Sequence, residues 1–327
     1  MAKKSEKKEI PASMADVAKA LEAYAYKHGQ DSIKTWNDWL EWLCGVFDWN
    51  NMKFGEEGGH PLVERFEWAQ KDNPEFFAAM QSWLEYAFRE MTTKGPTDAF
   101  GSIYENCFQS KGKADQNGQF FTPMHVCDLM AKVLGPQMPG EDGIIKYNDC
   151  AVGSGRMLVA AWGAADKYAK NYFEAGDLDA TSVRMTALNM MVNGMVGTVH
   201  CQNALSHEWR FGYVVNACKV PFANDFAAIE FVGDEKEMAW KRERLLELMK
   251  DWNVGKYRPQ EDGGEEGVGQ EKTTSGQQQG DGGEQEAPVE AAGAREEPKT
   301  GEEAEEDENA PEAPPSDGGA VMQEELF

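Results

Sequence analysis

The stretch IIKYNDCAVGSGRMLVAAWG, residues 144–163, decides the fold. It begins with bulky and β-branched residues, which are typical of a buried strand, and it ends with residues that favour a helix. Gly153-Ser154-Gly155 lies between the two halves. Glycine lets the backbone adopt positive φ angles and lets a ligand approach the chain closely. Such a turn is as consistent with a purely structural connection as with a cofactor-binding loop.

The strand, turn and helix pattern recurs further along the chain. It returns in YFEAGDLDATSVRMTALNMMVNG, residues 172–194, and shorter predicted strands follow within 198–205 and 211–216. Strands that alternate with helices predict an α/β fold with a parallel sheet and right-handed crossovers.

An acidic residue follows the glycine turn at the end of the next predicted strand. Asp177 lies 22 residues after Gly155, at the end of the second predicted strand. A carboxylate there can accept hydrogen bonds from ribose hydroxyls. The alternative is a helix cap, for which Asp179 is also a candidate. Met157 and Leu158 stand where a third glycine would be expected, which disfavours a dinucleotide. Together these features favour a cofactor that contains a nucleoside.

The segments before residue 144 are predicted to be helical. Apolar residues recur at three- and four-residue spacing over 13–28, 35–47 and 73–91, as in amphipathic helices. We interpret their Trp and Phe stripes as core, with base stacking as the alternative. Ser13 is predicted to cap the first helix. Thr122 is predicted to cap a later one that Pro123 opens.

Charge and aromatic residues divide the chain unevenly. Residues 261–327 hold 21 acidic and 3 basic residues, and so carry −18 of the net charge of −25. Since the only aromatic residue after Tyr257 is Phe327, this part cannot bury enough apolar surface to order itself. We therefore predict a helical N-terminal region (1–97), a cofactor domain (98–258) and a disordered acidic tail (259–327).

The composition excludes several classes of protein. The 6 cysteines form no paired motif, the 5 histidines are scattered, and the chain shows neither a signal peptide nor a long apolar run. We therefore expect a cytoplasmic protein with no metal site and no membrane segment. Net acidity argues against tight autonomous binding to DNA, which usually needs a basic face.

Four segments, taken in order, resemble the adenine-specific DNA methyltransferases of the gamma order, close to the modification subunits of type I restriction-modification systems. They are DAFGSIYENC (98–107), NGQFFTPMHVCDLM (117–130), NDCAVGSGRML (148–158) and AGDLDATSVRMTALNMMVNG (175–194). The resemblance runs from about Asp98 to Phe222. It implies a Rossmann-like sheet, S-adenosylmethionine as cofactor, and the exocyclic amine of adenine in DNA as substrate.

The resemblance also implies residue roles. Phe121, Thr122 and Pro123 would pack over the methionine part of the cofactor, and Asp177 would bind its ribose. The glycine turn matches the family at the cofactor-binding residues Asp149, Gly153, Ser154 and Gly155, and departs from it at Cys150, Val152 and Arg156. A carboxylate such as Asp149 would favour the ammonium and sulfonium charges. Asn203 stands where the family has an Asp that contacts the cofactor's adenine.

The family's catalytic motif is degenerate here. The family has Asn or Asp, then Pro-Pro and an aromatic residue, and these hold the adenine amine and stack on the flipped base. In FGYVVNACKVPF (211–222) the candidates are Asn216, Pro221 and Phe222, at a different spacing. The sheet is also predicted to be truncated after its fourth strand. The alternative to an enzyme is therefore an inactive methyltransferase-like protein that serves as a DNA- or clamp-associated regulatory module.

The chain ends in QEELF, which resembles the pentapeptide that binds the bacterial sliding clamp. Gln323 would hydrogen-bond at the rim of a pocket that Leu326 and Phe327 fill. An unspecific end is the alternative. The expected partners are thus DNA, the clamp, and a specificity or other partner subunit, in a bacterial, phage or mobile-element setting.

Overall fold

The computed structural model describes residues 12–52, 61–108, 121–135, 137–217 and 227–252. Pro221, Phe222 and the QEELF segment lie outside these ranges. Among the residues described, no helix is long and apolar enough to cross a membrane.

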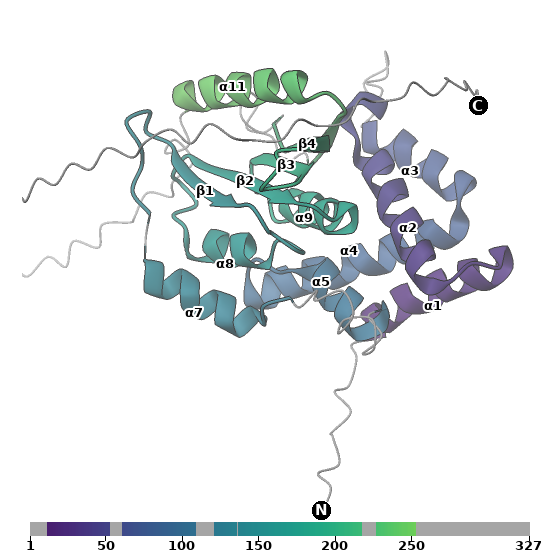
Figure 1. Cartoon of the computed structure of the whole chain (residues 1–327). Helices are drawn as coiled ribbons and strands as arrows, with labels where there is room; N and C mark the ends of the chain where they lie inside the picture. The colour runs from purple at the N-terminus through teal and green to yellow at the C-terminus, as the bar shows by residue number, and fades with distance from the viewer. Residues whose placement is uncertain (1–11, 53–60, 109–120, 136, 218–226, 253–327) are drawn as a thin grey trace, which may run out of the picture. The chain divides into compact units, whose positions relative to one another are not determined.

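A five-stranded mixed sheet forms the centre of the fold (Figure 1). Its strands lie in sequence order: β1 (Ile145–Asp149), β2 (Asn171–Asp177), β3 (Gly197–Gln202), β4 (Trp209–Val215) and β5 (Ile229–Val232). The first three are parallel, whereas β4 and β5 run antiparallel to their neighbours. The α/β class is confirmed, but the prediction of a parallel sheet is wrong for β4.

The length of one connection explains the reversal. Only residues 203–208 join β3 to β4, and a parallel crossover needs about a dozen residues. So short a connection permits only a hairpin, in which β4 returns alongside β3. The carboxyl end of β4 therefore lies at the opposite end of the sheet from the carboxyl ends of β1, β2 and β3.

Helices cover both faces of the sheet. Alternate strand residues point to opposite faces, so Phe173, Ala175 and Val199 share one cluster with α8 (Arg156–Ala164) and α9 (Ala180–Val192). Tyr172 and Val196 pack with α11 (Glu235–Asp251) in a second cluster. Figure 1 shows α11 on one side of the sheet and α8 and α9 on the other. Next to α8 lies α7 (Met124–Leu134).

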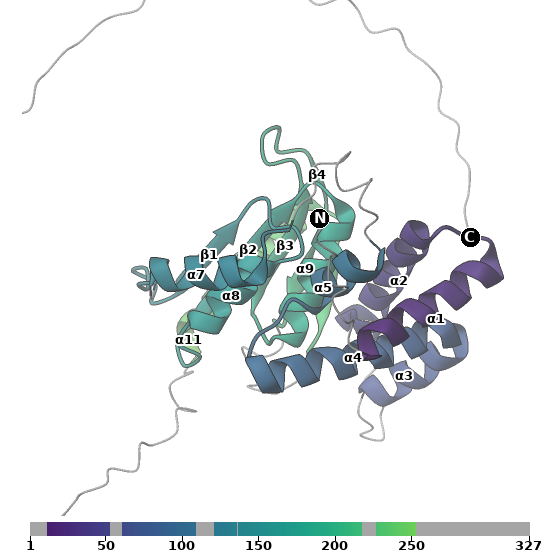
Figure 2. The same ribbon diagram turned by 90° about the horizontal axis from the view of Figure 1, so that it is seen from below.

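The N-terminal helices join the larger of these cores. They are α1 (Ala12–His28), α2 (Ser32–Phe47), α3 (Pro61–Asp72) and α4 (Pro74–Lys94), with a 3₁₀ turn at Trp49–Asn51. Figure 2 shows α1 beside α4, which it contacts. Trp36, Trp39 and Trp83 are fully buried, which confirms the interpretation of these stripes as core.

Two local features of this region bear on the predictions and on the site. Ser13 is not a cap, because α1 already includes it, and its hydroxyl accepts a hydrogen bond from Arg89. The short helix α5 (Ala99–Ile103) continues into a π-helical turn at Tyr104–Phe108. It packs against α4 and α9.

Candidate functional site

The glycine loop joins β1 to α8 at the carboxyl end of the sheet. Gly153 has φ of +58° and Gly155 has φ of +89°, a region in which a side chain is strained. A Cβ at Gly153 would lie 3.1 Å from the Phe121 ring, and one at Gly155 would lie 3.2 Å from Thr186. Glycine is favoured at both positions, because a side chain at this φ is strained and its Cβ would also contact a neighbour tightly.

Asp177 ends β2 beside this loop. One carboxylate oxygen accepts a hydrogen bond from the Gly153 N–H at 2.9 Å, and the other accepts one from the Asp179 N–H at 2.9 Å. Each oxygen keeps a lone pair for a further donor. Burial raises the pKa of Asp177 above its usual range. The interpretation of Asp179 as the helix cap is confirmed, since its carboxylate accepts from the Ser182 N–H.

Residues 121–123, which we call the strap, lie over the loop. The Phe121 ring stands against Gly153 and meets Tyr104 edge to face. The carbonyl of Thr122 accepts a hydrogen bond from Arg156 at 3.0 Å. Thr122 does not cap α7; Pro123 holds the N-cap position and no side chain caps that helix. The strap and the glycine loop thus pack directly against each other.

Three other predicted residues lie at the same end of the sheet. Asp149 ends β1, and its carboxylate accepts from the Ala151 N–H. Ser154 is buried, with its hydroxyl bonded to Asp98 at 2.6 Å. Asn203 follows β3, but its side-chain oxygen already accepts from the Leu205 and Ser206 N–H groups. Both lone pairs of the Asn203 side-chain oxygen are therefore occupied by backbone N–H groups, although the resemblance implied contact with the cofactor's adenine.

The comparison with known families decides the identity of this region. Residues 95–239 match the family model described as N-6 DNA Methylase. The match supports the assignment of this region to the adenine-specific DNA methyltransferases. The prediction of an adenine-specific DNA methyltransferase family is thereby confirmed. No solved structure matches the chain significantly.

The methylase domain does not bring Asn216 to the glycine loop. Val215, the neighbour of Asn216, pairs with Gly197, whereas Asp177 pairs with Cys201 at the other end of β3. At about 3.3 Å per residue, the two ends are at least about 13 Å apart. The reversal of β4 is the cause. Asn216 is thus corrected as a member of the site, and Pro221 and Phe222 lie outside the described residues.

Asn216 instead has a structural role in the methylase domain. It is fully buried, with φ of +54°. Its amide nitrogen donates to the carbonyls of Met190, Met191 and Met195, and its oxygen accepts from the Ala228 N–H. These bonds satisfy backbone groups at the end of α9 and at the entry to β5. The side chain is 0% exposed, so a substrate cannot reach it in this structure.

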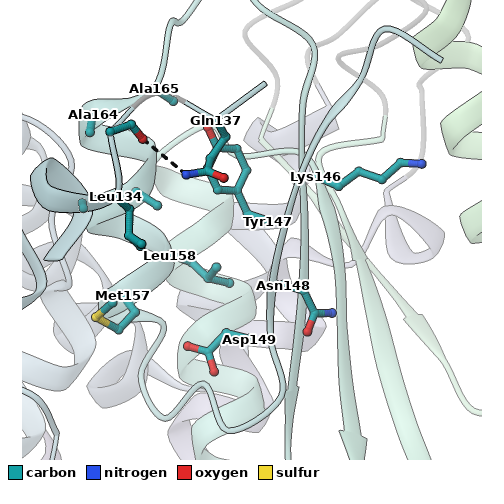
Figure 3. Close-up of a pocket in the computed structure, with 13 residues that line it drawn as sticks. Leu134, Gln137, Lys146, Tyr147, Asn148, Asp149, Met157, Leu158, Ala164 and Ala165 are labelled. Atoms are coloured by element: carbon teal, nitrogen blue, oxygen red, sulfur yellow. Dashed lines mark hydrogen bonds between the residues drawn. The ribbon is translucent and has the colours of Figure 1, made fainter. Parts of the chain in front are cut away.

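A cavity of about 270 Å³ lies along β1, between this strand, α7 and α8. Figure 3 shows its wall, formed by α7, α8 and β1, with Tyr147 and Leu158 pointing into the space. Over the described residues β1 pairs only with β2, so its outer edge is open. Leu129, Val133 and Leu134 of the adjoining α7 are exposed. The alternation of Lys146 and Asn148 with Tyr147 indicated only that one face of this strand is exposed, not that the strand lies at the edge of the sheet.

The sequence prediction also missed a buried ion cluster behind the loop. Arg156 contacts both Asp98 and Glu105, which belong to the helical segment that precedes the strap. Asp98 caps α5 and Glu105 lies in the π-helical turn that follows it, seven residues later. The sequence does not reveal which cation faces these two carboxylates.

Proposed function

We propose that this chain binds S-adenosylmethionine at the glycine loop, beside the strap and Asp177, and acts in methylation of the exocyclic amine of adenine in DNA. The observation that carries the proposal is the Asp177 carboxylate, which bridges the glycine loop and the end of β2 within the N-6 DNA methylase region. A half-buried carboxylate with spare lone pairs suits a ribose diol.

The chemistry of the surrounding residues fits this cofactor. S-adenosylmethionine carries no phosphate, so it needs no third glycine in the first turn of α8, where Met157 and Leu158 stand. The bare backbone of Gly153 and the aromatic face of Phe121 suit a flat or apolar ligand part. Asp149 supplies a negative charge on the β1 side. When bound, the cofactor supplies the electrophilic methyl group, and these residues orient it.

The proposed partners follow from the family and from the tail. DNA is the substrate of the proposed reaction. A partner subunit of the restriction-modification type would add sequence specificity, and QEELF would deliver the protein to a sliding clamp. The proposed organisation keeps the boundaries 1–97, 98–258 and 259–327.

A second candidate function is a non-catalytic module that retains the cofactor lobe. The buried position of Asn216 favours it, because the group expected to hold the adenine amine is enclosed among backbone groups and out of reach of a substrate. If methylation occurs, a different polar group must accept the two N–H bonds of the amine.

Two measurements test the proposal in sequence. Calorimetry with S-adenosylmethionine should show binding by the full chain. The protein is then incubated with labelled S-adenosylmethionine and mixed DNA, with and without a sliding clamp, and the digested nucleosides are analysed by mass spectrometry. We expect methyladenine from the wild type and none above background from Asp177→Ala.

The outcomes separate the candidates. Binding without methyladenine supports the non-catalytic module, and no binding refutes the cofactor site itself. Asn216→Ala is an unsuitable control for loss of activity, because its hydrogen bonds support the fold.

A further inference from the structure

Arg156 connects three segments that are distant in the sequence. It is the first residue of α8 and only 6% exposed. Its Nε donates to Asp98 at 2.7 Å, and its two terminal nitrogens donate to the Glu105 carboxylate at 3.3 and 3.0 Å. One of those nitrogens also donates to the Thr122 carbonyl at 3.0 Å. A single guanidinium thus joins the helical segment, the strap and the start of α8.

Asp98 ties the same cluster to the glycine loop. Its carboxylate also accepts from the Ser154 hydroxyl at 2.6 Å, the Gly101 N–H at 2.8 Å and the Asn189 amide at 2.6 Å. Ser154 lies between the two loop glycines. Arg156 and Asp98 together therefore hold the glycine loop through Ser154. Arg156 also holds the strap through its bond to the Thr122 carbonyl.

Stability alone is a weak explanation for this cluster. Removing charges from water costs several kcal/mol per ion, and replacing a buried ion pair by apolar residues is often neutral or stabilising. The side chains of Arg156 and Asp98 are 7% and 1% exposed, so the desolvation cost is large. What the guanidinium provides and an apolar side chain cannot is directional bonding to a carboxylate and a backbone carbonyl at once.

The strap that Arg156 holds forms one wall of the site. Phe121 precedes Thr122 directly and stands against Gly153, and the Arg156 guanidinium lies 5.7 Å from the centre of the Phe121 ring. Asp177, by contrast, is bonded to Gly153 and Asp179 and has no contact with Arg156 among these bonds. Arg156 therefore holds the strap, whereas the N–H groups of Gly153 and Asp179 hold the Asp177 carboxylate.

We propose that Arg156 is a positioning residue, which latches the strap against the glycine loop and so places Phe121 for contact with the non-nucleoside part of the cofactor. This inference rests on the proposed function. It predicts that loss of the latch weakens binding of the whole cofactor but leaves binding of its nucleoside, which the Asp177 side holds, almost unchanged.

The test compares two ligands on two variants. Arg156→Lys keeps the positive charge near Asp98 but loses the planar fork that reaches Glu105 and Thr122 together. We expect its affinity for S-adenosylmethionine to fall about tenfold or more, as for one lost charge-assisted hydrogen bond. Its affinity for adenosine should stay within about threefold. The matched control is Arg184→Lys, since Arg184 is a partly buried arginine that pairs with Glu41 in another part of the fold; neither affinity should change.

A second measurement needs no ligand. Hydrogen exchange of the peptide that covers the strap and α7 should be faster in Arg156→Lys than in the wild type and unchanged in Arg184→Lys. If Arg156→Lys does not fold, Glu105→Gln replaces it, because Glu105 is the most exposed member of the cluster, at 32% of its side chain. An equal loss of both ligands, or no change in either ligand and in exchange, overturns the latch. Failure of the wild type to bind S-adenosylmethionine is a different result, and it refutes the proposed function.

Discussion

The two ends of the central sheet differ in what their polar residues are free to do. At one end, the Asp177 carboxylate is half-buried and accepts one backbone hydrogen bond on each oxygen, which leaves capacity for a ligand. At the other end, Asn216 is fully buried and satisfies four backbone groups. Both residues follow buried strands and both were predicted to be functional. A polar residue after a strand can serve a site only if that strand runs toward it.

The largest expected effect concerns the Asn216 end. Asn216→Ala should lower the free energy of unfolding by about 3 kcal/mol, because it leaves buried backbone groups unpaired and puts Ala at positive φ. The melting temperature should fall by roughly 6–12 °C. Asn148→Ala is the control, since Asn148 is an exposed asparagine on β1 and should change stability little. A thermally unaffected Asn216→Ala that loses methylation would restore Asn216 as a catalytic candidate.

Asp177→Ala tests the other end. It should weaken S-adenosylmethionine binding by about 100-fold, as expected for the loss of about 3 kcal/mol from charge-assisted hydrogen bonds to a ribose. Calorimetry measures this effect directly. Asp179→Ala, two residues further on, removes a helix cap and should cost about 1 kcal/mol of stability while leaving the affinity within about threefold. Equal losses of affinity in both variants would argue against a specific role for Asp177.

The glycine loop offers a matched pair of glycines. Gly153→Ala places a strained Cβ 3.1 Å from Phe121 and should weaken cofactor binding by about tenfold, since strain of this kind costs on the order of 1–3 kcal/mol. Gly176→Ala puts its Cβ no closer than 3.7 Å to a neighbouring atom and without positive φ, so its affinity should stay near that of the wild type. If the two substitutions behave alike, the close approach of the strap to the loop is not important for binding.

The smallest effect is a dependence on pH. Burial raises the pKa of Asp177, so its carboxylate begins to take up a proton at a higher pH than an ordinary Asp. The proton removes a charge and an acceptor oxygen, so cofactor affinity should fall by a few-fold as the solution is acidified. The contribution of Asp177 to stability has the opposite sign, because the folded state holds this proton more tightly than the unfolded state. Calorimetry across pH should show a flatter acid limb for Asp177→Asn.

Local chemistry made one end of the sheet predictable. Positive φ at Gly153 and Gly155, and an acidic residue at the end of the next strand, follow from residue type and spacing. The sequence also predicted that the Trp stripes of the N-terminal helices are buried, since a periodic apolar face has to be covered. The same reasoning predicted Asn216 to be a functional residue. The sequence shows that Asn216 follows a strand, but it does not show in which direction that strand runs in the sheet.

The sequence by itself therefore determined the α/β class, the family, the glycine loop and Asp177, all of which depend on residues close together in the chain. The tertiary structure alone decided that β4 returns alongside β3, that Asn216 caps backbone groups, and that Arg156 meets Asp98 across 58 positions. These outcomes depend on which distant segments share a core. That is set by the balance of burial and hydrogen bonding over the whole domain, and no single segment contains it.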